Sequence, residues 1–179
     1  MSRGVATRYA PALVALHWVT ALIIFGLLGL GFFVLADMPN ADPAKLGILK
    51  LHMAGGMLVF VLTILRYLVR AWSARPAPAS TGSPFLDRLA AIMHSSLYAV
   101  VILMIVSGWS TGFLIRGAFL PNGALPASFA ELPTFQAHAF LAALLSLLIL
   151  AHVAAALYHQ FALKDRLFAR IWFGRHTVA

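Results

Sequence analysis

The chain has 179 residues, of which 62% are hydrophobic and only 10% charged, and it carries a net charge of +8 and no cysteine. In soluble globular proteins charged residues make up about a quarter of the chain, so this composition excludes an ordinary soluble domain and indicates lipid as the main solvent. The basic residues lie between long uncharged tracts, which is typical of membrane boundaries and not of a nucleic-acid surface. The lack of cysteine excludes disulfides, iron–sulfur clusters and covalently attached c-type haem.

The first uncharged tract runs from Tyr9 to Ala36 and follows a short basic segment that contains Arg3 and Arg8. It is too long for the apolar region of a secretory signal peptide, and no small-residue cleavage site leads from it into a soluble domain. An apolar stretch of this length is sufficient to cross a bilayer as a helix. We therefore predict the first transmembrane span at about 10–36.

Three further apolar tracts predict spans at about 48–72, 87–115 and 133–163. The second is interrupted by Arg66 and Arg70, which must reach the interface or find an anionic partner. The connections are rich in proline and glycine, and unpaired backbone groups are not tolerated in hydrocarbon, so each span is expected to be helical. The predicted fold class is an all-α membrane protein, a four-helix transmembrane bundle that forms a single domain over residues 1–179.

The distribution of lysine and arginine predicts the orientation of these spans, because basic residues are enriched on the cytoplasmic side. Three of the thirteen basic residues lie in the first and third connections, together with most of the few acidic residues. The other ten flank the opposite ends of the spans, so both termini are expected in the cytoplasm. The three are Lys45, Lys50 and Arg116, and the ten are Arg3, Arg8, Arg66, Arg70, Arg75, Arg88, Lys164, Arg166, Arg170 and Arg175.

Histidines are the main candidates for function, because ionisable residues inside a membrane are costly and usually mark a site. Any one of them could instead be a structural histidine bonded to a neighbouring backbone carbonyl. In the fourth span two of them are 14 residues apart, which places them on nearly one face and about 21 Å apart along the helix axis. Six of the seven histidines lie in the predicted spans: His17, His52, His94, His138, His152 and His159.

The depths of these histidines suggest two pairs. His52, near the external end of the second span, is level with His138, and His17, two turns into the first span, is level with His152. Two imidazoles facing an apolar slot between helices are suited to the axial ligation of a haem iron. We therefore predict His17, His52, His138 and His152 as the axial ligands of two haem irons, one near each face of the bilayer.

Other uses of buried histidine fit the sequence less well. Zinc prefers four ligands around one ion, often with carboxylates or thiolates, and the predicted spans supply neither in the interior. Histidine-based metal or proton transporters remain an alternative of another class, but they usually add intramembrane carboxylates and broken helices.

Two arginines and two glycines of the second span also bear on a haem site. Arg66 follows His52 by 14 residues, so it faces the same side at the depth of the inner haem, where it and Arg70 could pair with haem propionates. Both arginines could instead simply mark the cytoplasmic boundary. Gly55 and Gly56 could admit a porphyrin plane, but ordinary close packing of helices is the favoured interpretation.

With these features on four spans, the sequence resembles the bacterial cytochrome b561 family of di-haem membrane proteins from about Tyr9 to Phe173. The features occur in the same order along the chain. They are Leu16-His17-Trp18, Leu51-His52-Met53-Ala54-Gly55-Gly56 with Arg66 and Arg70, His94 with Leu97-Tyr98, and His138, His152 and His159 with Lys164-Asp165.

The resemblance implies a multi-pass protein of the bacterial inner membrane that holds two haem b groups and transfers electrons between a quinone, ubiquinone in particular, and another redox partner. Some stand-alone members oxidise superoxide at the outer face. The family is also similar to cytochrome b subunits of formate dehydrogenases and hydrogenases, so a membrane subunit docked onto a larger enzyme is the main alternative.

A quinone site requires a proton donor near the inner haem, and three residues are candidates. His159 and Lys164 lie at the cytoplasmic end of the fourth span, and His94 enters the third span at a similar depth. Each could instead bond to the backbone, to a haem propionate or to lipid headgroups. Exchanged ligation, with His94 in place of His17 or His159 in place of His152, is a further alternative.

On the outer side Lys45, Lys50 and Arg116 are candidates for a cationic rim that attracts a small anion such as superoxide. Acidic residues in the same connections weaken that interpretation. The remaining histidine, His176, is expected to face solvent in the basic tail.

Overall fold

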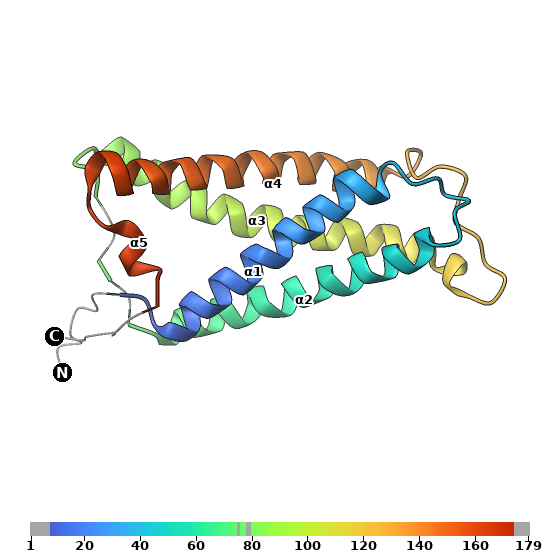
Figure 1. Ribbon diagram of the computed structural model, residues 1–179, viewed down its shortest axis with the longest axis horizontal. Helices are drawn as coiled ribbons and strands as arrows, with labels where there is room; N and C mark the ends of the chain where they lie inside the picture. Colours follow the sequence, from blue (N-terminus) through green and yellow to red (C-terminus); the bar gives the residue numbers. More distant parts are fainter. Residues whose placement is uncertain (1–7, 75, 78–79, 174–179) are drawn as a thin grey trace. The chain divides into compact units, whose positions relative to one another are not determined.

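A computed structural model describes residues 8–74, 76–77 and 80–173 (Figure 1). The regular secondary structure of these residues consists of helices joined by loops. Arg3, Arg75, Arg175 and His176 lie outside the described residues, and the orientation of the spans remains a prediction. The elements in chain order are α1 (Pro11–Leu30), η1 (Gly31–Leu35), α2 (Lys45–Trp72), α3 (Pro84–Leu114), η2 (Arg116–Phe119), α4 (Pro133–Tyr158), η3 (His159–Leu163) and α5 (Leu167–Arg170).

Four of these helices are long and apolar enough to cross a bilayer, which confirms the predicted spans. They run over Pro11–Leu35, Lys45–Trp72, Pro84–Leu114 and Pro133–Leu163, and α1 and α4 each end in a short π-helical turn, η1 and η3. Large apolar side chains are exposed along all four, with Phe33 at 79% and Leu22 at 68% exposure. Such surfaces are stable in lipid and not in water, so the all-α membrane fold class is confirmed.

Two helices begin three residues earlier than the apolar pattern predicts. Pro84 is the first residue of α3, a position where the missing N–H of proline costs nothing. The carboxylate of Asp87 in the first turn also favours a helix start there. At the start of α2, Asp42 Oδ1 accepts a hydrogen bond of 2.8 Å from the Ala44 N–H, so the polar Lys45 joins the helix.

The described residues divide into two compact units, and each of the four long helices contributes to both. The first unit holds the described residues of Met1–Ala21, Leu62–Leu97 and Leu147–Ala179, and the second holds Leu22–Val61 and Tyr98–Ser146. The candidate histidines are divided between them. His17, His94, His152 and His159 belong to the first unit, and His52 and His138 belong to the second.

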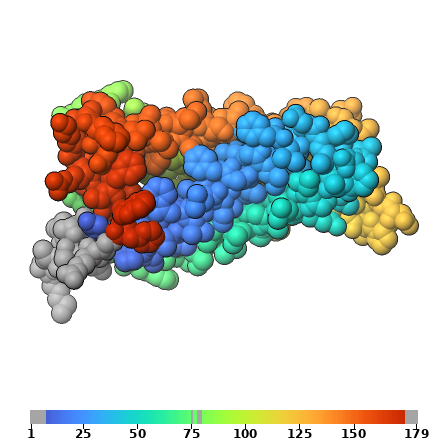
Figure 2. Space-filling view, in the orientation of Figure 1, coloured from blue at the N-terminus to red at the C-terminus, as the bar shows by residue number. Residues whose placement is uncertain are grey.

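In the first unit the end of the chain packs against the beginning of α1. Trp18 Nε1 donates a 3.0 Å hydrogen bond to the Ile171 carbonyl, and the Tyr9 N–H donates one of 3.1 Å to the Arg170 carbonyl. Arg170 Nη1 in turn donates to the Ala77 carbonyl at 2.9 Å. In Figure 2 the red atoms of this terminal segment lie beside the blue first turns of α1. The segment therefore fixes the end of the helix that carries His17.

In the second unit two connections are tied together. Asn40 Nδ2, in the connection after α1, donates a 2.7 Å hydrogen bond to the Pro126 carbonyl in the connection before α4. Gln136 Nε2 in the first turn of α4 donates to the Ala130 carbonyl at 2.7 Å. These bonds hold the two loops over the same end of the second unit.

Candidate functional site

In the second unit the structure brings His52 of α2 and His138 of α4 together as the sequence predicts. Their ring centroids are 6.1 Å apart and their planes are inclined by 75°. Imidazole nitrogens bind a metal at about 2 Å, so two rings on opposite sides of one iron have centres about 6 Å apart. The spacing of this pair therefore fits bis-histidine ligation of a haem iron.

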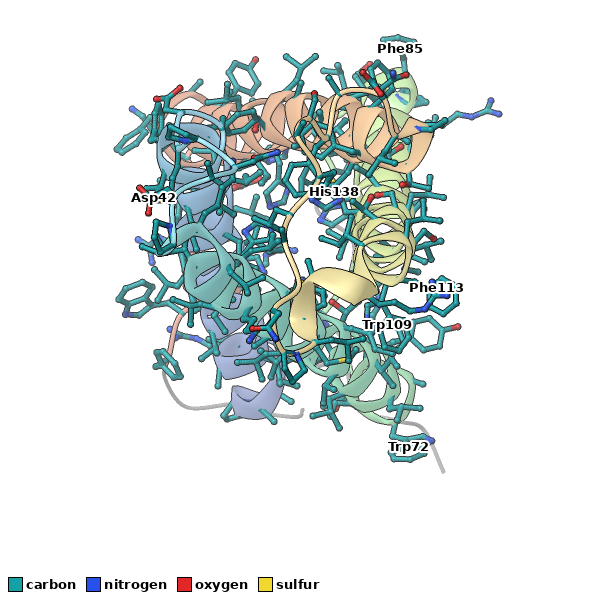
Figure 3. All side chains as sticks on the ribbon, turned by 90° about the vertical axis from the view of Figure 1, so that its right-hand side faces the viewer. Asp42, Trp72, Phe85, Trp109, Phe113 and His138 are labelled. Atoms are coloured by element: carbon teal, nitrogen blue, oxygen red, sulfur yellow. The ribbon has the colours of Figure 1, made fainter. Side chains whose placement is uncertain are left out.

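His138 is oriented by two partners on α3. Its Nδ1 lies 3.1 Å from both the Met104 carbonyl and Ser107 Oγ, and the Ser107 hydroxyl donates to the same carbonyl at 3.0 Å. These contacts place the ring proton on Nδ1 and leave Nε2 to bind a metal, which is the usual arrangement for a ligating histidine. Figure 3 shows His138 pointing inward, whereas Trp109 and Phe113 of α3 point away from the interior.

Ser107 was not predicted from the sequence as a site residue. Two threonine hydroxyls lie next to it. Thr111 Oγ1 donates to the Ser107 carbonyl at 3.0 Å and lies 2.9 Å from Thr134 Oγ1. Gly108 gives the imidazole room, since a Cβ there would lie 2.9 Å from His138 Cε1. No spacing rule predicts these contacts, because they depend on how two helices are rotated toward each other.

The two glycines of α2 have different surroundings. A Cβ at Gly55 would lie 2.7 Å from Leu27 Cδ2, so Gly55 lies in close contact with α1, which agrees with the helix packing favoured from the sequence. A Cβ at Gly56 would have no atom within 4 Å. Space beside α2 is therefore open at Gly56, one turn after His52.

Two candidate ligands lack the hydrogen bond that a structural histidine would make. Nδ1 of His17 and Nδ1 of His52 are buried and have no hydrogen-bond partner among the described residues. A buried polar atom without a partner is costly, and few such atoms persist in native proteins. The missing partners argue against the interpretation that these two are ordinary core histidines and are consistent with a group held between the helices.

In the first unit the predicted pair lies within a larger cluster. His17 has Arg66, His94 and His152 as charged or titratable neighbours. The ring centroids of His94 and His152 are only 5.4 Å apart, with planes inclined by 86°. The structure therefore brings His17 and His152 into one cluster, and it adds His94, which had no predicted partner.

His94 also makes the backbone contact that is expected of a structural histidine. Its Nδ1 lies 2.7 Å from the Ala90 carbonyl one turn earlier in α3. This bond leaves Nε2 free, so it is compatible with ligation as well as with a structural role. Arg66 is half-buried and is a neighbour of both His17 and His152, whereas Arg70 lies one turn further along α2.

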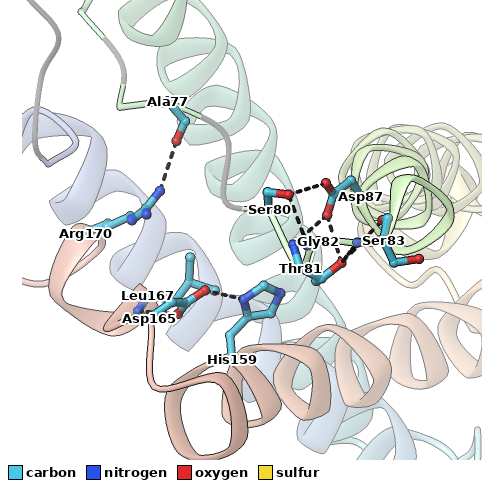
Figure 4. A network of polar contacts seen from close by, with 10 residues as sticks. All are labelled: Ala77, Ser80, Thr81, Gly82, Ser83, Asp87, His159, Asp165, Leu167 and Arg170. Atoms are coloured by element: carbon cyan, nitrogen blue, oxygen red, sulfur yellow. Dashed lines mark hydrogen bonds and ion pairs between the residues drawn. The ribbon is translucent and has the colours of Figure 1, made fainter.

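His159 lies apart from these three histidines, at the end of α4, and pairs with Asp165. Its Nδ1 is 2.6 Å from Asp165 Oδ2, and Asp165 Oδ1 accepts a 3.1 Å hydrogen bond from the Leu167 N–H (Figure 4). Lys164 and Arg166, on either side of the aspartate, both have positive φ angles, 56° and 57°. Strained backbone of this kind, next to a π-helical turn, is often found at functional sites.

A second carboxylate lies near His159. Asp87, in the first turn of α3, interacts electrostatically with His159 and accepts hydrogen bonds from Ser80 Oγ at 2.7 Å and the Thr81 N–H at 2.8 Å (Figure 4). The chain has only five acidic residues, so two of them near one histidine is a marked concentration. The position of Asp165, six residues after His159 at a predicted helix end, was the one signal that could have indicated this pairing.

The remaining candidate cations differ in exposure. Lys164 is exposed and forms the left-handed residue that ends η3. Lys50 and Arg116 are exposed, and each lies over an aromatic ring, that of Phe119 at 5.9 Å and that of Phe113 at 4.4 Å. Lys45 by contrast is only 5% exposed, so the three cations of the predicted outer rim do not form one exposed group.

Imidazoles grouped on different spanning helices are the ligand arrangement of multi-pass b-type cytochromes, in which histidines on different helices hold a haem without covalent links. Comparison with known proteins agrees. The family model of the prokaryotic cytochrome b561 proteins matches residues 8–174.

Curated relatives of similar length support the same assignment. Cytochrome b561 homolog 2 of Escherichia coli K12 is 28% identical over 88% of this chain and 87% of its own length. Cytochrome b562 of Cereibacter sphaeroides is 29% identical over 91% and 94%. The probable superoxide oxidase CybB of Yersinia pestis is 24% identical over 92% and 95%.

The chain belongs to the prokaryotic cytochrome b561 family. It is therefore a membrane electron-transfer protein of a family that binds haem b, and a multi-pass protein of the bacterial inner membrane.

Proposed function

We propose that this chain is a di-haem b-type cytochrome, a single transmembrane domain that carries electrons from a donor at the outer face to a quinone at the cytoplasmic face. The observation that carries the proposal is the division of the candidate histidines into two groups, one in each compact unit, with the His52–His138 pair at 6.1 Å. The proposed orientation places both termini in the cytoplasm, as the distribution of basic residues predicts.

The candidate residues have proposed roles in binding the two haems. His52 and His138 would hold the outer haem, and His17 and His152 would hold the inner one, with Arg66 and Arg70 available to pair with the inner propionates. Each haem supplies a one-electron carrier when bound, and two histidine ligands leave no open position on iron. The protein therefore sets distances and potentials rather than carrying out chemistry at the metal.

The quinone end is proposed for the cytoplasmic side of the first unit, because quinone reduction consumes protons. One quinone takes up two electrons and two protons, and ubiquinone is the expected substrate. His159, held by Asp165 and close to Asp87, offers a histidine–carboxylate proton donor there, and His94 and Lys164 are further candidates. The Nδ1–Asp165 contact directs Nε2 of His159 away from the aspartate, so Nε2 is the atom that would pass on a proton.

Superoxide is the proposed outer donor. The probable superoxide oxidase among the relatives suggests this choice. Two superoxide ions would each lose one electron to become dioxygen, which supplies the two electrons that one quinone takes up. A haem held by His52 and His138 would supply the one-electron acceptor for this reaction, and superoxide would not need to bind its iron.

The first test counts haems in the purified chain. A reduced-minus-oxidised spectrum should show b-type bands at about 560 nm. The haem-to-protein ratio should be about two if each histidine group binds one haem. A histidine-based transporter would contain no haem, so a chain purified without these bands would contradict the proposal.

The second test distinguishes a stand-alone oxidoreductase from a membrane subunit of a larger enzyme. The isolated chain should reduce a short-chain ubiquinone when superoxide is generated enzymatically, and added superoxide dismutase should suppress the reaction. If both haems are present but quinone is reduced only after a soluble dehydrogenase is added, the docking subunit is the better description.

A further inference from the structure

Lys45 is a buried cation in an unfavourable position. It is the first residue of α2, and it is only 5% exposed. The amino end of a helix carries a partial positive charge, so an ammonium group there is repelled rather than stabilised. Burial adds a second cost, because a charge removed from water requires an opposite charge or several hydrogen bonds.

The observed partners of Lys45 only partly offset these costs. Its Nζ donates a 2.5 Å hydrogen bond to the Met38 carbonyl and lies 5.7 Å from the centre of the Phe129 ring. An ammonium group has three donors, and neither partner carries a net negative charge. Among the described residues Lys45 forms no ion pair with a carboxylate.

The position of Lys45 relates it to the second unit's histidine pair. It precedes His52 by seven residues on α2, which is about 20° short of two full turns and about 10 Å along the axis. Lys45 and His52 therefore share one face of the helix. A haem bound through His52 would bring two propionate carboxylates into the second unit, and Lys45 lies on the face of α2 from which His52 would hold that haem.

We propose that the ammonium group of Lys45 binds a propionate carboxylate of the haem held by His52 and His138. This inference rests on the proposed di-haem function. The salt bridge would supply the missing negative charge, offset the repulsion from the end of α2, and stabilise the reduced form of the outer haem by neutralising a propionate.

A haem propionate inside the second unit fits Lys45 better than a small anion that arrives from solvent. The Phe129 ring covers the ammonium group, and the loop that carries Met38 is tied to the neighbouring connection by the Asn40–Pro126 hydrogen bond. The exposed cations Lys50 and Arg116 are open to solvent anions, and Lys45 is not.

The test is a spectroscopic redox titration of the purified chain with both haems bound. In Lys45→Met the outer haem should titrate at a lower potential, because the unneutralised propionate favours the oxidised iron, while the inner haem is unchanged. Lys45→Arg keeps the charge and should restore the outer potential. Lys50→Met is the matched control for loss of an exposed lysine from the same unit and should leave both potentials at the wild-type values.

Three outcomes distinguish failure of the Lys45 inference from failure of the proposed function. A haem-to-protein ratio of two in Lys45→Met, with both potentials unchanged, would overturn the role of Lys45 and leave the di-haem proposal intact. A chain that never holds the second haem would refute the proposed function itself. If the wild-type potential moves with added chloride and the Lys45→Met potential does not, Lys45 binds a free anion and the propionate assignment is wrong.

Discussion

The two units have the same type of ligand but different surroundings. In the second unit only His138 of the pair has hydrogen-bond partners, and both are neutral, the Met104 carbonyl and the Ser107 hydroxyl. In the first unit four histidines occur with an arginine and two carboxylates. A site that only relays an electron needs little beyond ligands, whereas a site that also moves protons needs titratable groups. The difference between the units therefore supports quinone chemistry in the first unit and simple electron entry in the second.

The largest effect should come from removing single ligands. His52→Ala or His138→Ala should reduce the haem-to-protein ratio from about two to about one by loss of the outer haem, and His17→Ala or His152→Ala should remove the inner haem. Spectra of the two groups of variants should lose different parts of the b-type band.

His94→Ala is the matched control, because it removes an imidazole from the first unit's cluster. It should retain both haems and alter quinone reduction only. If it loses the inner haem while His17→Ala keeps it, the ligands are His94 and His152, which the 5.4 Å contact between their rings would then explain.

The next effect concerns proton supply in the first unit. Asp165→Asn can still accept the hydrogen bond from His159 but removes the negative charge, so quinone reduction should slow by about tenfold or more. Reduction of the haems by the outer donor should be unaffected, and stopped-flow spectra would measure the two steps separately. Asp37→Asn, an exposed change in the other unit, is the control. Equal rates in wild type and Asp165→Asn would exclude His159 and Asp165 as the proton donor.

Arg66 should have a smaller effect, limited to the first unit. Arg66→Gln removes a half-buried positive charge beside His17 and His152, so the inner haem should become harder to reduce and its midpoint potential should fall. The outer haem serves as an internal reference in the same redox titration. Arg70→Gln, one turn further along α2, should give a weaker shift. A shift of equal size at both haems would point to a general change in the protein and not to a local propionate pair.

The smallest effect is expected for Ser107. Ser107→Ala removes one of the two partners of His138 Nδ1 but leaves the Met104 carbonyl, so both haems should remain bound and the free energy of unfolding should fall by about 1 kcal/mol. The outer haem should change slightly in potential, and resonance Raman spectra of the iron–imidazole mode would show the altered hydrogen bond. Loss of the outer haem would mean that Ser107, and not Met104, orients the ring.

Most of the fold could be predicted because each span is a long and mainly apolar tract, and lipid permits few structures other than helices. The depth of each histidine followed from the helical rise, which is why His52 and His138 were placed together. The rotation of helices toward each other is not set by spacing along one helix. The contacts of Ser107 with His138 and of His94 with His152 therefore could not be derived. The Asp165 pairing depends on two residues with left-handed backbone, which side-chain patterns do not reveal.

The hydrogen bond from Trp18 to the Ile171 carbonyl joins residues 153 positions apart in the chain. During synthesis α1 is made first, but its partner carbonyl is among the last described groups to be made. The helix that carries His17 therefore lacks this contact until Ile171 has been translated. The geometry of the first unit is completed only after residue 171 has been made, so a protein truncated before residue 171 would lack this contact at the end of its first helix.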